Sequence, residues 1–250
     1  MEAYEYQTLY GFESTYWWYR HLHKVLLELL LTQNPGQNQK ILEAGCGTGQ
    51  NINNLADNLP ATVYGFDLSV HAAPFWKLRQ LARVCNASIN QIPYANEVFD
   101  IVVCVDVLES QEVLEALAIA EMVRVTKPGG LICLVVPAFD WLMSPGHHQA
   151  VHAVRRYSKR RLLALFSNYP VHEKMTRYLF APVFPMIALY RWWHKAFPSE
   201  TSEPPRSELV KLPSWLNWIL YKYVSIEQHF ITHFDFPFGS SIITMVRKGM

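Results

Sequence analysis

Several features that assign a protein to a class are scarce in this sequence. The chain of 250 residues has 22 Lys and Arg against 21 Asp and Glu, so it lacks the basic excess of a nucleic-acid-binding domain. It has only 4 cysteines, none of them in a C-x-x-C pair, which favours buried, reduced thiols over disulfides or zinc. We therefore expect no nucleic-acid partner and no bound metal.

Long apolar runs are also missing, and we expect no leader sequence. The longest apolar stretch, residues 178–193, contains two prolines and falls short of the roughly 20 residues that span a membrane. The first residues carry Glu where a signal peptide would carry basic side chains. We expect a cytoplasmic protein whose residues 1–250 form a single domain.

Aromatic residues, in contrast, are abundant, with 8 Trp, 13 Tyr and 13 Phe, as in a large apolar core or an apolar ligand pocket. Short apolar runs alternate with stretches of helical periodicity. One of them, residues 99–105, is apolar almost throughout, which is typical of a strand buried on both faces of a parallel sheet. This alternation predicts an α/β fold with a doubly wound, mostly parallel, seven-stranded, Rossmann-like sheet. The expected strands are 40–44, 62–66, 84–88, 99–105, 131–136, 171–178 and 240–248, and the expected helices are 16–31, 50–59, 70–82, 111–125 and 158–166.

The segments outside the central core are assigned from their composition. The aromatic residues 16–19 cannot all face one core stripe, so we expect residues 1–35 to form a helical lid over the ligand site. Residues 38–137 would form the ligand-binding core. The remainder, 138–250, would hold a loop on the substrate side, a helical insertion over 179–235 and the final strand.

The stretch "EAGCGTGQN" (residues 43–51) follows the first expected strand directly. Gly45, Gly47 and Gly49 stand at every second position, where neither a strand nor a helix accommodates them well. A glycine-rich turn between a strand and a helix lets the backbone approach a ligand and offers the free N–H groups of the helix start.

Two carboxylates and one misplaced glycine narrow the choice of ligand. A dinucleotide-binding turn would have its third glycine at position 50, where this chain has Gln50. Glu43 would be awkward beside a pyrophosphate but suits a cationic ligand. Asp67 ends the second strand, where a carboxylate can accept hydrogen bonds from both hydroxyls of a ribose. The pattern favours a ribose-bearing ligand with a positive head group.

This stretch closely resembles the first motif of class I SAM-dependent methyltransferases. The resemblance continues through "VYGFDLS", "IPYANEVFDIVVCVDVLES" and "KPGGLICLVVP", in order, over residues 38–137. It implies S-adenosyl-L-methionine (SAM) as the cofactor and the corresponding Rossmann-like methyltransferase fold. Ser88 stands where relatives have an acidic residue that contacts adenine. The cofactor-binding residues that the resemblance implies are Glu43, Gly45, Cys46, Gly47, Gly49, Asp67, Leu68, Ser88, Ile89 and Val105.

The outer segments resemble a bacterial subgroup of methyltransferases of the type 11/12 kind. This subgroup has "W-W-x-x-R" near the N-terminus and "S-x-x-H…H-x-x-R-R-Y" after the fifth strand. Asp106 follows the fourth strand and would either face the site or cap the next helix. The expected substrate-binding residues are Trp17, Trp18, Tyr19, Asp106, His148, Arg156 and Tyr157.

A catalytic base, if the reaction needs one, is expected in the same loop. Ser110 occupies a position where relatives commonly have a histidine, so His147 and His152 become the candidates. A histidine near its unperturbed pKa of about 6.5 could take a proton from a hydroxyl or ammonium group. The alternative is that these histidines anchor the loop or contact the substrate.

The remaining features leave alternatives open. The basic run at 155–161 is either the solvated start of a helix or a contact for an anionic substrate or lipid headgroups. The insertion is core, a wall of the substrate pocket or an interfacial membrane anchor, and we favour the pocket wall. The sequence does not determine the oligomeric state.

We expect a SAM-dependent methyltransferase that acts on O or N of a small, apolar or aromatic molecule, in secondary metabolism. The alternatives are a catalytically inactive SAM-binding scaffold or a nicotinamide-dependent reductase.

Overall fold

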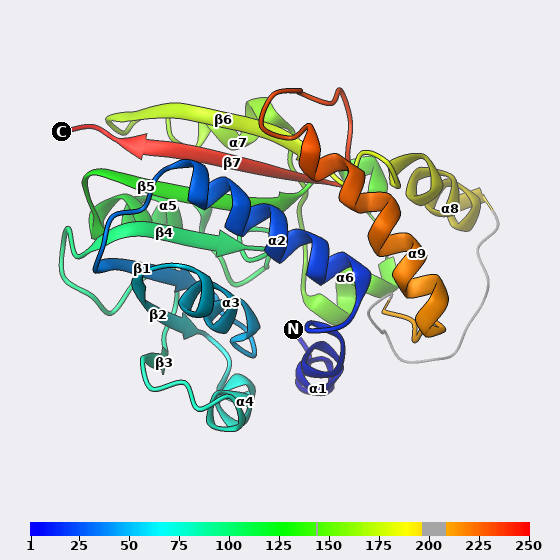
Figure 1. Ribbon diagram of the computed structural model, residues 1–250, viewed down its shortest axis with the longest axis horizontal. Coiled ribbons are helices and arrows are strands. Elements are labelled where there is room, and N and C mark those ends of the chain that lie inside the picture. The colour runs from blue at the N-terminus through cyan, green and yellow to red at the C-terminus, as the bar shows by residue number, and fades with distance from the viewer. Residues whose placement is uncertain (144, 197–208) are drawn as a thin grey trace.

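The structure, a computed structural model, describes residues 1–143, 145–196 and 209–250, apart from the side chains of 145–147 and 194. Its centre is a seven-stranded sheet with the strand order β3-β2-β1-β4-β5-β7-β6 (Figure 1). Neighbouring strands are parallel except for β7, which pairs antiparallel with both β5 and β6. The predicted doubly wound, mostly parallel sheet is confirmed. The strands are β1 Gln39–Ala44, β2 Ala61–Asp67, β3 Val84–Asn86, β4 Phe99–Val105, β5 Thr126–Pro137, β6 Val171–Leu179 and β7 Ser241–Lys248.

Helices cover both faces of this sheet, as a doubly wound fold requires. The first core cluster joins one sheet face to α2, α3 and α4 and to the end of α9, and the second joins the other face to α5 and α7. Figure 1 shows α2, α3 and α9 in front of the sheet and α5 and α7 behind it. The helices are α1 Ala3–Phe12, α2 Trp17–Thr32, α3 Gln50–Asn58, α4 Ala73–Leu78, α5 Glu115–Val125, α6 Pro145–Val151, α7 Lys159–Ala164, α8 Phe184–Ala196 and α9 Ser214–Val224, with short 3-10 helices η1 Val70–Ala72, η2 Asp140–Leu142 and η3 Ser225–His229.

Local sequence signals set several of these boundaries. The side chain of Ser158 accepts a hydrogen bond from the Arg161 N–H and caps α7 as its sequence suggests. The predicted turn 127–130 lies inside β5, where the pairing with β4 is irregular. Part of the expected loop 138–157 is helical, since it contains η2 and α6.

Two expectations about the helices need correction. The expected lid, residues 1–35, is not a single lid. Helix α2 buries an apolar stripe from Leu22 to Leu30 against the sheet and so belongs to the core layer. The helix expected over 111–125 begins only at Glu115, and no side chain caps it. Asp106 therefore does not serve as its cap.

The insertion between β6 and β7 is helical where it is described, with α8, α9 and η3. Within the described ranges, no helix is both long enough and apolar enough to cross a membrane.

Candidate active site

A cavity of about 870 Å³ lies at the carboxyl ends of the parallel strands. Its walls come from the ends of β1, β2 and β4, from α1 and the start of α2, and from α6, α8 and residues 209–220. Figure 1 shows α1 and α6 beyond the arrowhead of β4. Open α/β sheets bind ligands at this edge, and the volume is sufficient for a cofactor together with a small acceptor.

The glycine turn after β1 forms one wall of the cavity. Gly45 has φ +82°, and a Cβ atom there would lie 2.3 Å from a methyl carbon of Val107. Gly49 has φ +88°, and a Cβ atom there would lie 2.3 Å from Leu81. Both positions therefore require glycine, because an L side chain would be strained and would collide. Gly45 and Gly47 line the cavity, whereas Gly49 is not among its lining residues and shapes the turn instead.

Glu43, at the end of β1, carries a buried carboxyl group with one unsatisfied oxygen. Its Oε1 accepts a hydrogen bond from Asn51 Nδ2 at 2.8 Å, while Oε2 has no partner among the described residues. Burial, reinforced by the nearby carboxyl groups of Glu13 and Asp67, raises the pKa of Glu43 to about 8. A cation entering the cavity would give this carboxylate its missing partner.

Asp67, at the end of β2, is held next to the glycine turn. Its Oδ2 accepts a hydrogen bond from the Gly47 N–H at 2.9 Å. Its Oδ1 accepts one from the Ser69 N–H at 3.0 Å and one from the Tyr6 hydroxyl at 3.1 Å. Tyr6 belongs to α1 and escaped the sequence analysis, because nothing distinguishes it there from the other aromatic residues of the first two helices. The contact brings α1 over the cofactor edge of the cavity.

The other residues implied by the resemblance lie close by. Leu68, Ser88, Ile89 and Val105 all line the cavity, and the side chain of Leu68 is half exposed. The Ser88 hydroxyl accepts a hydrogen bond from the Asn90 N–H at 3.2 Å. Their arrangement gives an apolar surface beside Asp67 that a planar ring could occupy.

Cys46 also lines the cavity. Burial raises the pKa of its thiol well above the ordinary value, so the group stays neutral.

A second acidic group follows β4, formed by Asp106 and Glu109. Asp106 lies at φ +50° and lines the cavity, with its side chain exposed to that hollow; desolvation by the surrounding protein raises its pKa to about 6, partly offset by Arg156. Burial and the neighbouring Asp106 raise the pKa of Glu109 further, and its Oε2 has no partner in the described part of the chain. Glu109 was missed, although its place three residues after Asp106 could have suggested it.

His152 is fixed by two carboxylates. Its Nδ1 lies 3.0 Å from Glu112 Oε1, and its Nε2 lies 3.0 Å from Glu2 Oε1. These hydrogen bonds raise its pKa, so the ring remains protonated to higher pH. With both nitrogens engaged, the ring has none free to take a proton from an acceptor, and this geometry argues against His152 as the base.

The other residues of this loop that the sequence predicted for the site lie in different surroundings. The side chain of His147 lies outside the described residues, while His148 is buried and lines the cavity. Arg156 also lines it, and its Nε donates to the Ala138 carbonyl at 2.7 Å. The expected substrate contact of Tyr157 is wrong. Its side chain is in the core, with its hydroxyl donating to the Leu108 carbonyl at 3.0 Å, because neighbours in an extended segment point to opposite sides.

The aromatic residues at the start of α2 form the opposite wall. Trp17, Trp18 and Tyr19 all line the cavity. Trp18 stacks on Phe180 with ring centroids 3.6 Å apart and planes at 5°. Burial raises the pKa of Tyr19, so its phenol stays neutral.

The central part of the chain is similar to known methyltransferases. Residues 42–134 match the family model described as a methyltransferase domain. An uncharacterized protein of Methanocaldococcus jannaschii is 33% identical over 119 residues, which are 46% of this chain and 50% of the relative. The chain thus spans about half the length of the curated relative that it matches.

Two solved structures illustrate the likeness of the fold. The [4+2]-cyclase SpnF is 20% identical with a TM-score of 0.56, covering 90% of this chain and 80% of that one. Geranyl diphosphate C-methyltransferase from Streptomyces coelicolor A3(2) is 15% identical with a TM-score of 0.58, covering 92% and 81%. At these identities the likeness concerns the fold. Because the matched residues 42–134 include both the glycine turn and Asp67, which this fold brings to one cavity, this part of the chain is a methyltransferase domain with the Rossmann-like fold of the class I SAM-dependent enzymes.

Proposed function

We propose that the protein binds SAM in this cavity and transfers its methyl group to O or N of a small, apolar or aromatic acceptor. The observation that carries the proposal is the pairing of two carboxylates at neighbouring strand ends. Asp67 lies next to the Gly47 N–H, and Glu43 holds a buried oxygen without a partner. SAM has a ribose for the first carboxylate and the ammonium group of its amino-acid end for the second.

The charge of the cavity supports the same ligand. Besides Glu43 and Glu109, which hold protons, five carboxyl groups line the cavity, against two arginines and the protonated His152, so a positively charged ligand gains from the surrounding field. Leu68 and Ile89 would pack against the adenine ring. The lining carboxyl groups are Glu5, Glu13, Glu43, Asp67, Asp106, Glu109 and Glu112, and the lining arginines are Arg156 and Arg191.

The bound cofactor supplies a methyl group activated by the adjacent sulfonium. Held by Asp67 and Glu43, it would give this methyl group to a lone pair of the acceptor and would leave as S-adenosylhomocysteine. The protein's part is to align the acceptor and to exclude water. The aromatic wall of Trp17, Trp18 and Tyr19 would serve both purposes, alignment of the acceptor and exclusion of water.

An acceptor hydroxyl or ammonium group must also lose a proton. We assign this proton to the Asp106 carboxylate, in place of the histidines that the sequence suggested. A pKa of about 6 leaves Asp106 ionised at neutral pH yet more basic than an ordinary Asp. Glu109, with the higher pKa of the two, keeps its proton and leaves the charge on Asp106.

The first helix acts as a cover in this proposal. Tyr6 donates to the oxygen of Asp67 that a ribose hydroxyl would use, and the Glu2 N–H donates to the Ala150 carbonyl of α6 at 3.0 Å. Cofactor binding should therefore rearrange residues 1–24 and 138–157 together. Hydrogen exchange in both segments should slow when S-adenosylhomocysteine is added, whereas protection restricted to residues 43–70 would contradict a cover.

A screen for methyl transfer tests the proposal. The protein is incubated with SAM and panels of phenols, amines, carboxylic acids and isoprenoids, and products are detected by mass spectrometry. We expect one added methyl group, formed together with S-adenosylhomocysteine. Tight cofactor binding without transfer to any acceptor would instead favour the scaffold alternative. The similarity to a cyclase is a reason to record acceptor rearrangements in the same screen.

A further inference from the structure

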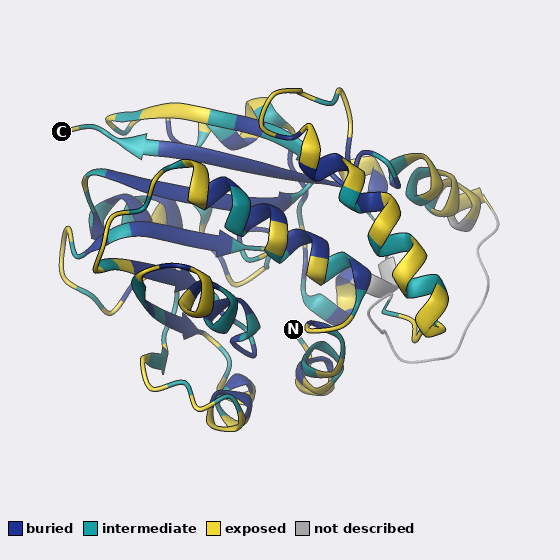
Figure 2. Ribbon diagram, viewed as in Figure 1, coloured by how far each residue is buried: buried dark blue, intermediate teal, exposed yellow. Residues whose placement is uncertain are grey.

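Exposed apolar side chains gather on the two helices inserted between β6 and β7. More than half of the exposed large apolar residues of the described chain lie between Met186 and Phe238. Figure 2 shows exposed residues recurring along the outward side of both α8 and α9. Soluble proteins rarely leave so large an apolar surface uncovered without a binding role.

On α9 these side chains form a continuous stripe. Trp215, Trp218, Ile219 and Tyr223 are all exposed, and their spacing of three, four and eight residues places them on one side of the helix. The other side of α9 carries Val224, which is buried in the core. The helix is thus apolar both toward the protein and away from it.

The same arrangement recurs on α8. Leu189, Trp192 and Trp193 are exposed, lie three and four residues apart and do not line the cavity, whereas the exposed Met186 and Tyr190 line it. An ordinary surface helix would carry charged or polar side chains at these positions.

The charges on these elements have one sign. Helix α8 and residues 209–224 contain no Asp or Glu, whereas Lys211 and Lys222 are cationic and exposed. Of the other cations there, Arg191 lines the cavity and Lys195 donates to the Trp141 carbonyl at 2.7 Å. Between 225 and 238, Glu227 is buried and Asp235 pairs with Lys159. The Lys222 ammonium lies 5.7 Å from the centre of the Trp218 ring. Tryptophan and tyrosine beside lysine are the side chains that gather at the interface between lipid and water, and the basic groups complement anionic headgroups.

The apolar surface and the active-site cavity share these helices. Ile187 of α8 and Leu220 of α9 line the cavity, while Trp193 and Trp218 of the same helices are exposed and do not line it. On α8 the two surfaces meet, because Met186 and Tyr190 are exposed and also line the cavity.

We propose that the outward sides of α8 and α9 dock on the surface of an anionic lipid bilayer, lying in its interface. Docking places the mouth of the cavity at the membrane and favours an acceptor with a hydrocarbon tail. The inference about the acceptor rests on the proposed function, whereas the docking does not.

Flotation with lipid vesicles tests the docking surface on the full chain. The vesicles are phosphatidylcholine alone or with about 30% phosphatidylglycerol. The test variant combines Trp193→Glu with Trp218→Glu, and the matched control is Leu117→Glu, an exposed apolar position of α5 behind the sheet. Titration of all three proteins with S-adenosylhomocysteine should give equal affinities, which shows that the variants are folded and reads the cofactor site separately.

We expect the wild type and the control to bind the anionic vesicles, and the double variant to lose at least about tenfold in partitioning. Replacing Lys211 and Lys222 together with Gln should reduce the preference for anionic over neutral vesicles. Absence of wild-type binding to the anionic vesicles, equal binding to both vesicle types, or undiminished binding of the double variant would overturn the proposal. A wild-type dimer that ignores vesicles and becomes monomeric in the double variant would overturn it as well, because a second copy would then cover this surface.

Discussion

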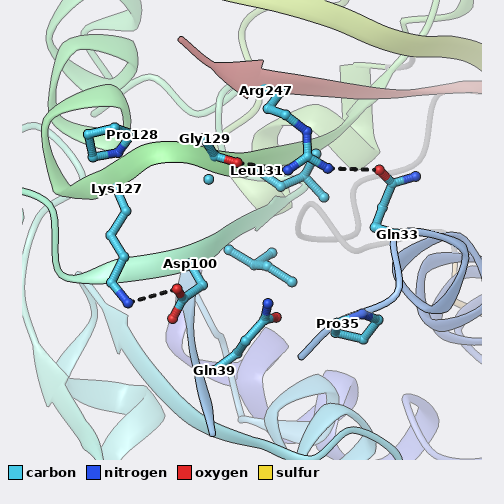
Figure 3. Close-up of a pocket in the computed structure, with 11 residues that line it drawn as sticks. Gln33, Pro35, Gln39, Asp100, Lys127, Pro128, Gly129, Leu131 and Arg247 are labelled. Carbon is cyan, nitrogen blue, oxygen red and sulfur yellow. Dashed lines mark hydrogen bonds and ion pairs between the residues drawn. The ribbon is translucent and has the colours of Figure 1, made fainter. Parts of the chain in front are cut away.

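Strand β4 carries an aspartate at each end, and the two side chains have opposite surroundings. At the amino end, Asp100 Oδ1 lies 2.7 Å from Lys127 Nζ (Figure 3). Its Oδ2 accepts a hydrogen bond from the Lys40 N–H at 2.8 Å. At the carboxyl end, Asp106 faces the large cavity with its pKa raised to about 6. One residue type on one strand is thus satisfied at one end and left available for chemistry at the other.

The hollows at the two ends differ in the same way. The pocket at the amino end has a volume of about 130 Å³, and Arg247 in it donates to the Gly129 carbonyl at 2.7 Å and to Gln33 Oε1 at 3.1 Å (Figure 3). At the other end, Glu43 and Glu109 each keep a buried oxygen without a partner in the described part of the chain. The small pocket also has a buried oxygen without a partner in the described part of the chain, Gln39 Oε1, but this belongs to a neutral amide. The charged groups of the small pocket are paired, whereas the acids of the large cavity are left for a ligand.

Replacing the two aspartates one at a time should give the largest difference between the two ends of β4. Asp106→Asn should lower turnover by roughly 10²–10⁴-fold for a hydroxyl or ammonium acceptor, because the proton acceptor is lost. Affinity for S-adenosylhomocysteine should stay unchanged, and the acid limb of the pH–rate profile, near pH 6 in the wild type, should flatten. The matched control Asp100→Asn should keep near-normal turnover. Equal losses in both variants would show that the two ends do not differ in this way.

The cofactor edge is tested by Asp67→Ala. Loss of a charge-assisted contact should weaken binding of S-adenosylhomocysteine by about 1.5–3 kcal/mol, which calorimetry measures directly. Unchanged affinity in a folded Asp67→Ala variant would remove Asp67 from the cofactor site.

Glu43 links the cavity to stability through pH. Its pKa is raised from 4.5 to about 8, so the folded protein holds a proton that the unfolded chain loses, and the wild type loses stability as the pH rises through this range. Glu43→Gln should therefore leave the melting temperature unchanged near pH 4. At pH values above 8 the variant should melt at a higher temperature than the wild type, with a gain of up to about a few kcal/mol in the free energy of unfolding. Affinity for S-adenosylhomocysteine should fall. A melting temperature that gains nothing at high pH would show that Glu43 is not a buried, uncompensated acid.

The smallest effect is expected at the amino end. Lys127→Gln removes a partly exposed ion pair, so the free energy of unfolding should fall by at most about 1 kcal/mol in chemical denaturation. Turnover and cofactor affinity should stay at wild-type values. A large loss of either would mean that this end also takes part in function.

The elements predicted correctly from the sequence depend on short-range patterns. Apart from Asp100, strand β4 is a continuous apolar run, and the turn at Gly45 and Gly49 needs a left-handed backbone that few other residues adopt. Such signals are visible within a few residues of each other, so the sheet and the place of the cofactor cradle followed from them.

The residues that sequence analysis missed or misplaced depend on packing between distant segments. Tyr6 meets Asp67 across 61 positions, and His152 meets Glu2 across 150. Tyr157 follows a cavity residue directly but points into the core. Helix α2 reads as one amphipathic element, yet only the structure shows its first turn at the cavity and the remainder under the sheet.

A calorimetric titration of the wild-type protein with S-adenosylhomocysteine, and in parallel with NADH, tests the central claim most directly. That claim is that the cavity at the carboxyl end holds SAM through Asp67 and Glu43. We predict micromolar binding of S-adenosylhomocysteine, release of a proton near pH 7 as the raised pKa of Glu43 falls on meeting the ligand's cationic end, and no binding of NADH. Binding of NADH without binding of S-adenosylhomocysteine would contradict the account.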